Sequence, residues 1–166
     1  MPRQYFDNLD LAILNALTAN ARTPYLEIAR DFGVSGAAVH QRVQRLIANG
    51  VIVGTSCTLA PESLGFTTVA YVGLNLQPEA DYEYVLDSLE KIPEVTECHL
   101  VTGPYDLLIR LEAHDNHHLF ELVQRSLRPL GIARTETMLS FREVFKHTLP
   151  ISNEEPPRPK FASEKA

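Results

Sequence analysis

The 166-residue sequence lacks features that mark several classes of protein. No apolar run approaches the roughly 20 residues of a membrane helix, and the N-terminus has no apolar signal region. We therefore expect a cytoplasmic protein with no membrane partner. Its two cysteines, Cys57 and Cys98, lie far apart in different predicted elements. They form neither a disulfide framework nor a metal motif, so we expect ordinary reduced thiols.

The motifs of common enzymes are also missing. The sequence has no glycine-rich phosphate loop and no serine, cysteine or histidine set in a catalytic context. His114 and His118 are four residues apart, the spacing of a helical metal site. Because Asp115 or Asn116 is expected to cap a helix, His114 would lie outside it, and a solvated helix start is favoured. We expect no cofactor, no metal and no enzymatic activity.

The charge is divided unevenly along the chain, whose net charge is −6. Residues 1–60 hold five arginines and four acidic residues, whereas residues 61–166 hold ten basic and seventeen acidic residues. Only the first part could face DNA phosphates without strong repulsion. The length suffices for two small domains, and a turn-rich segment at 61–65 marks the boundary. We predict domains at 1–60 and 61–148, and a flexible, proline-rich tail at 149–166.

The first part predicts three helices, at 7–21, 23–33 and 34–50. Apolar residues recur at helical spacing in each, and Leu26 is among those expected to face inward. Gly33 ends the second helix, and Ser35 caps the third almost at once. Two helices joined by a short glycine-containing turn form the helix-turn-helix pattern. The strand predicted after them, Val51 to Leu59, would form a small wing or a connector.

The third predicted helix has one apolar and one polar face. The apolar stripe, at i, i+4 and i+7, should pack on the first two helices and consists of Val39, Val43 and Leu46. Side chains opposite the stripe and on its flanks can bond to base edges or phosphates, although a solvated helix face is the alternative interpretation. The predicted DNA-binding residues are Ser35, Ala37, Ala38, His40, Gln41, Arg42, Gln44 and Arg45.

Different contacts are expected within this set. His40 and Gln41 should lie near bases, and Arg42 and Arg45 near phosphates. Arg42 is closer to the packed edge, so a structural role is also open for it. The small residues at the start of the helix would allow close approach to a groove.

The second part alternates strands and helices in the order β-α-β-β-α-β. This order is the ferredoxin-like split unit, in which two helices cover one face of a four-stranded antiparallel sheet. The predicted fold class is therefore α+β, with a three-helix (winged) helix-turn-helix domain followed by a ferredoxin-like βαββαβ domain. The helix stripes are expected to include Tyr84 and Phe120. The last strand is expected to span 132–148, with Phe141 and Phe145 in alternation.

One helix layer leaves the other face of such a sheet uncovered. Alternation is expected to place Val72, Leu74, Leu100 and Leu108 on that face. An uncovered apolar face predicts a partner, and a homodimer pairing face to face is the simplest closed solution. It would also place two reading helices on two half-sites of double-stranded DNA.

Together these features resemble the Lrp/AsnC family, the leucine-responsive and asparagine regulators also called feast/famine regulators. The resemblance covers about residues 5–148. Its most specific motifs are Asp10-x-x-Ile13-Leu14, Ala21-Arg22, Val34-Ser35, Arg42-Val43-x-Arg45-Leu46, Gly50-Val51-Ile52 and Gly103-x-x-Asp106.

The resemblance implies a sequence-specific DNA-binding transcriptional regulator of amino-acid or related metabolism. It implies homodimers that often assemble into octamers, and a small-molecule effector, usually an amino acid, bound where dimers meet. The implied effector-binding residues are Gly103, Pro104, Tyr105, Asp106, Thr135 and Thr137. Backbone N–H groups beside glycine can approach a carboxylate, and an aspartate or threonine oxygen can accept from an ammonium. A plain hairpin turn capped by Asp106 is the alternative.

Two other functions are compatible with parts of the sequence. The sirohaem decarboxylases have a related fold and act on a tetrapyrrole, whose carboxylates would need clustered basic residues such as Arg110, Arg134 and Arg142. The other alternative is an amino-acid sensor that does not bind DNA. The Ser35 cap and the pair Arg42 and Arg45 argue against the sensor.

Overall fold

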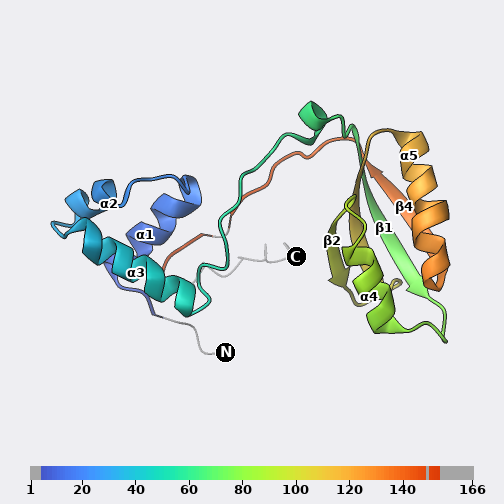
Figure 1. The fold of residues 1–166 in the computed structure, drawn as a ribbon, viewed down its shortest axis with the longest axis horizontal. Coiled ribbons are helices and arrows are strands. Elements are labelled where there is room, and N and C mark those ends of the chain that lie inside the picture. Colours follow the sequence, from blue (N-terminus) through green and yellow to red (C-terminus); the bar gives the residue numbers. More distant parts are fainter. Residues whose placement is uncertain (1–4, 149, 154–166) are drawn as a thin grey trace, which may run out of the picture. The chain divides into compact units, whose positions relative to one another are not determined.

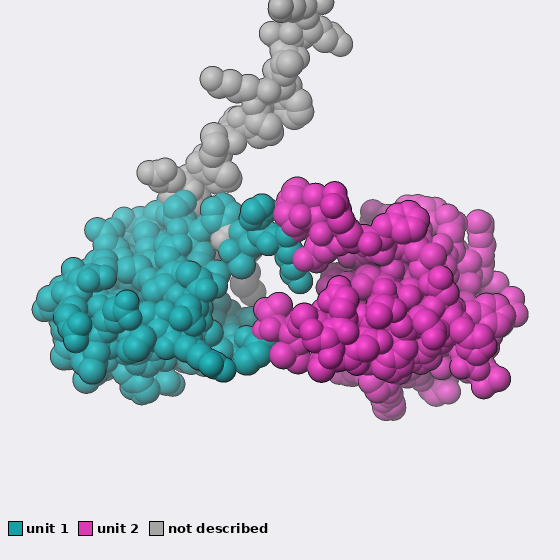
Figure 2. All heavy atoms as spheres, turned by 90° about the horizontal axis from the view of Figure 1, so that it is seen from above, with its two compact units in different colours: residues 1–57, 146–166 teal, residues 58–145 magenta. Residues whose placement is uncertain are grey.

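The computed structural model describes residues 5–148 and 150–153, and the chain forms two compact units. One unit comprises residues 1–57 and 146–166, and the other comprises residues 58–145 (Figure 2). This division lies near the boundaries expected at 60 and 148, and the described residues 150–153 pack on the first unit. The remainder of the predicted tail lies outside the described residues.

Among its described residues, the first unit contains three helices, which agrees with the prediction. They are α1 (Asn8–Ala19), α2 (Tyr25–Asp31) and α3 (Gly36–Ala48). All three contribute to one apolar core, formed by Ile13, Leu14, Ile28, Ala29, Val39, Val43 and Leu46. Leu26 is not part of it: its side chain is 66% exposed and lies beside Gly36 at the start of α3.

The segment that follows α3 is a connector, one of the two forms expected for it, but the predicted strand is wrong. Between Val51 and Ala60, all described, no residue is in a strand. A short 3-10 turn at Pro61–Leu64 then ends at Gly65, whose φ of 85° lies in the left-handed region that glycine adopts easily. Cys57 on the connector and Cys98 in the second unit are both free and exposed.

The second unit has the predicted βαββαβ order. Its elements are β1 (Thr68–Leu76), α4 (Tyr82–Glu90), β2 (Val95–Leu100), β3 (Leu107–Ala113), α5 (Asn116–Glu121) and β4 (Ile132–Ser140). The antiparallel sheet has the strand order β2-β3-β1-β4. α5 continues through a π-helical stretch, Leu122–Leu127, and a 3-10 turn, Arg128–Leu130. Throughout the described residues, no helix is both long and apolar enough to cross a membrane.

Helices α4 and α5 cover one face of this sheet (Figure 1). Val72 and Leu74 are fully buried in the core beneath them, so their predicted place on the uncovered face is wrong. Leu100 pairs with the buried Leu107 and therefore shares the helix side as well. Only Leu108 lies on the uncovered face as predicted. Alternation separates the two faces of a strand but does not say which one the helices cover.

The uncovered face has an apolar centre and charged surroundings. Register places Tyr71 opposite Met138 on β4 and Gly73 opposite Leu108 on β3. Val69 lies two residues before Tyr71 and shares its side. The charged side chains on this face are Arg110, Glu112, Glu97, Arg134 and Glu136.

β4 is shorter than predicted and ends at Ser140 rather than near 148. The reason is that β1 starts at Thr68, so the ladder ends where Val69 pairs with Ser140. Phe141 and Phe145 therefore lie beyond the strand and are 99% and 73% exposed. Two helix residues expected to face inward are also exposed, Tyr84 at 59% and Phe120 at 62%.

Candidate functional site

Helix α3 is capped and packed as its sequence predicts. The Ser35 hydroxyl accepts a hydrogen bond from the Ala38 N–H at 3.1 Å, which satisfies one of the free donors of the first turn. The stripe of Val39, Val43 and Leu46 is at most 3% exposed. This packing leaves the opposite face of the helix available to a partner.

The opposite face carries the side chains predicted to read DNA. Ala37, His40, Gln41, Gln44 and Arg45 are exposed, and Ala38 and Arg42 are partly buried. The His40 ring lies 5.8 Å from the ring of Tyr25, the first residue of α2. Sequence reasoning missed Tyr25, although a helix-turn-helix pattern places the start of the preceding helix close to α3.

Arg42 and Arg45 are both bound by a carboxylate of α1. One Arg45 nitrogen lies 2.7 and 2.9 Å from the two carboxylate oxygens of Asp10. Arg42 contacts Asp10 at 3.2 Å and also pairs with Asp7. Asp10 is only 3% exposed, and a buried carboxylate needs hydrogen-bonding partners, which these two arginines supply. We call this group, Asp7, Asp10, Arg42 and Arg45, the α1–α3 clamp.

The clamp changes the expected role of the two arginines. Sequence reasoning placed both near phosphates and gave only Arg42 a structural alternative; the ion pairs add an internal contact for each. The hydrogen bond from the Asp10 N–H, together with Arg42, lowers the pKa of Asp7. The hydrogen bond to Asp7 likewise raises the pKa of Arg42. Both shifts favour the charged pair over its neutral form.

The predicted effector loop lies between β2 and β3 and is fastened to β1. Asp106 accepts a hydrogen bond from the Leu76 N–H at 2.8 Å, and its own N–H donates to the Leu74 carbonyl at 2.9 Å. The Asn75 side-chain amide donates to the Pro104 carbonyl at 2.7 Å. Gly103 has a φ of 119°, which restricts that position to glycine in practice. Three hydrogen bonds therefore join the loop to β1.

Tyr105 extends from this loop over the uncovered face of the sheet. A Cβ atom built on Gly73 would lie 2.6 Å from the Tyr105 ring, so the ring occupies the space that a side chain at 73 would need. Partial burial, with a hydrogen bond to Glu136, raises the pKa of Tyr105. Gly73 and Glu136 are therefore functional-site candidates that sequence reasoning missed. The signal available was a glycine inside a strand, which often marks a close approach.

The structure does not bring all six predicted effector residues together within one chain. Thr135 and Thr137 pair with Leu74 and Val72, which places their side chains on the helix side of the sheet. Tyr105 lies on the opposite side. Gly103, Pro104, Tyr105 and Asp106 form one group, and the two threonines form another on β4.

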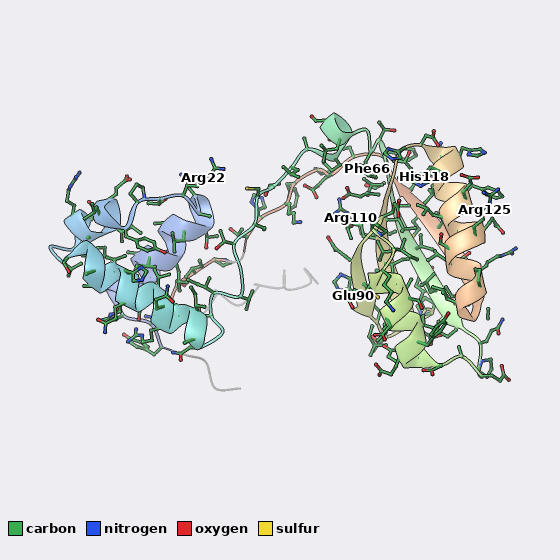
Figure 3. The ribbon with its side chains drawn as sticks, in the orientation of Figure 1. Arg22, Phe66, Glu90, Arg110, His118 and Arg125 are labelled. Atoms are coloured by element: carbon green, nitrogen blue, oxygen red, sulfur yellow. The ribbon has the colours of Figure 1, made fainter. Side chains whose placement is uncertain are left out.

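Most of the histidines and arginines that suggested other chemistry have partners within the second unit, where Figure 3 labels His118 and Arg110. Arg142 is exposed beyond the end of β4. Asp115 caps α5, and the His114 ring, outside the helix as predicted, stacks between Phe66 and His118 at 4.4 and 5.1 Å. The backbone N–H of His114 also donates a hydrogen bond to the His118 ring at 3.2 Å. Among the arginines, Arg110 pairs with Glu97 and Glu112, and Arg134 pairs with Glu136. These contacts all lie within the second unit.

Comparisons with known proteins cover both units. Residues 6–47 match a model of the AsnC-type helix-turn-helix domain, and residues 69–150 match a model of the Lrp/AsnC ligand binding domain. The regulatory protein AsnC of Haemophilus influenzae is 35% identical over 137 residues, which are 82% of this chain and 91% of that protein. AsnC of Escherichia coli K12 is 33% identical over 150 residues, which are 90% and 99% of the two chains.

Solved structures show the same similarity. The structure of E. coli AsnC matches with a TM-score of 0.81 over 88% of this chain and 99% of that one. A feast or famine regulatory protein from M. tuberculosis, solved in complex with L-methionine, is 27% identical and has a TM-score of 0.82. That match covers 89% of this chain and all of the other. The similarity in sequence and in structure therefore spans both units.

Proposed function

This chain belongs to the Lrp/AsnC family of helix-turn-helix transcriptional regulators, and on that premise we propose that α3 reads the sequence of double-stranded DNA. The observation that carries the proposal is the exposed polar face of α3, with Gln41 and Gln44 opposite the buried stripe and His40 on its flank. Glutamine and histidine side chains can bond to base edges in the major groove. Ala37 adds a small residue at the helix start, where close approach is needed.

The effector part of the proposal concerns the loop at Gly103–Asp106. We propose that the protein regulates amino-acid or related metabolism and responds to an amino acid bound at this loop, where two dimers meet in an octamer. Two features support it: the loop is preorganised, and a relative of the same fold has been solved with L-methionine. A second dimer could bring its own β4, with Thr135 and Thr137, to a loop that lacks them within its own chain.

Gln41→Ala tests base reading by α3. The best-bound sequence would first be selected from random duplexes. We expect the substitution to weaken binding to that sequence about tenfold, the cost of one lost base contact, while binding to random duplexes stays unchanged. Fluorescence anisotropy over a range of salt concentrations measures both. Gln77→Ala, in the second unit, is the matched control, and an equal effect of the two substitutions would refute base reading by Gln41.

Asp106→Asn separates an effector site from a plain turn. Asparagine keeps an oxygen that accepts from the Leu76 N–H, but it removes the charge that an effector ammonium would meet. A thermal-shift screen of the twenty amino acids identifies the ligand, since one that binds only the folded state raises the melting temperature. We expect the substitution to reduce that shift without lowering the melting temperature of the free protein. If the shift is as large as for the control Asp87→Asn, the carboxylate of Asp106 does not bind the effector.

A further inference from the structure

The last described residues of the chain pack on the DNA-binding unit. The Ile151 side chain contacts the apolar core of the three helices. The Asn153 side chain makes two hydrogen bonds to the backbone of Phe6, accepting from its N–H at 3.2 Å and donating to its carbonyl. Asn15 on α1 donates a longer bond, 3.4 Å, to the Ile151 carbonyl. Residues 150–153, named the strap here, therefore follow α1 from Asn15 to its beginning.

The strap reaches the place where α1 meets the clamp. Phe6 directly precedes Asp7, which caps α1 and pairs with Arg42. Asp10, one turn further, holds both arginines of α3. A chain of direct contacts therefore runs from Asn153 through the start of α1 to the reading helix. Asn153, where these contacts begin, belongs to the segment that follows β4.

We propose that Ile151 and Asn153 are positioning residues for α3, and that the strap keeps α1 in the arrangement in which α3 binds DNA. This inference rests on the proposed DNA binding. When the strap is detached, Phe6 loses both bonds to Asn153 and the core loses the cover of Ile151. The start of α1 is then held by fewer contacts, and its opening becomes easier. The chain passes between the two units twice, once after Cys57 and again between Phe145 and Lys146.

The test uses the full chain with Ile151→Ala and Asn153→Ala combined. Hydrogen exchange should become faster at the start of α1 but not in β1 or β3. Affinity for a random-sequence duplex of about 25 base pairs should fall about fivefold, because binding weakens in proportion to the lost fraction of competent protein. A chain ended after Asn153 keeps the strap and should behave like the full chain.

The affinity is measured at about 15 °C, near the usual maximum of protein stability. Far-UV circular dichroism at that temperature shows whether the unmodified chain and the double variant have the same helix content. If the strap only adds stability, the double substitution lowers the melting temperature but leaves this affinity unchanged. That result overturns the proposal. Unchanged exchange at α1 overturns it as well. If the unmodified protein binds no duplex, the proposed DNA binding fails, and the exchange comparison alone decides whether the strap holds α1.

Discussion

Arg45→Ala is expected to lower the free energy of unfolding of the DNA-binding unit by about 3 kcal/mol, because removing one partner leaves a buried charge insufficiently paired. Asp10 is 3% exposed and would keep only Arg42, at 3.2 Å. Arg45 itself is half exposed, so its removal costs little packing. Urea denaturation followed by circular dichroism measures the change.

Arg125→Ala is the matched control for this substitution. Arg125 lies on the surface of the second unit (Figure 3) and pairs with Glu121 one turn away, an ion pair of at most about 0.5 kcal/mol. Combining Arg45→Ala with Asp10→Ala should cost less than the sum of the two single changes, since the double variant buries no unpaired carboxylate. Equal stability of the Arg45 and Arg125 variants would show that Arg45 contributes no more than a surface ion pair.

The clamp also refines the expected salt dependence of DNA binding. If Arg45 contacted only phosphate, its removal would flatten the salt dependence and leave stability unchanged. An arginine that binds Asp10 with one nitrogen can still present the others to phosphate, because its side chain is 52% exposed. The stability and salt measurements together therefore separate the internal role from the DNA role.

The features that sequence predicted well are local ones. Val39, Val43 and Leu46 are buried because a periodic stripe on one helix identifies its own packed face. Ser35 caps α3 because the cap needs only a hydroxyl three residues before the N–H that it binds. The βαββαβ order was also readable, since each element carries its own pattern.

The features that sequence missed depend on residues far apart in the chain. Asp10 and Arg45 are separated by 35 positions, and nothing in either local pattern pairs them. Val72 and Leu74 were assigned to the wrong face because alternation is the same on both faces of a strand. Asn153 and Phe6 are 147 positions apart, and the proline-rich sequence around Asn153 suggested only a flexible tail.

Met138→Asp is expected to separate the proposed homodimer, raising its dissociation constant about a hundredfold, since an unpaired carboxylate would be buried between two apolar sheet centres. Met138 lies opposite Tyr71 in the uncovered face and is 41% exposed in the single chain, so the fold itself should tolerate the change. The nearest residue on its side of β4 that can be charged is Glu136, which would repel a new carboxylate rather than pair with it.

Sedimentation equilibrium measures the dissociation constant, and thermal unfolding confirms that the variant is folded. Phe120→Asp is the control, because Phe120 is 62% exposed on α5, in the helix layer on the other side of the sheet. Loss of the dimer only with Met138→Asp would place the pairing surface on the uncovered face. Met138→Asp should also weaken binding to an operator with two half-sites far more than binding to a single half-site. In a dimer, binding of one reading helix raises the effective concentration of the other at the second half-site. Equal dimerisation by both variants would mean that the subunits pair through another surface.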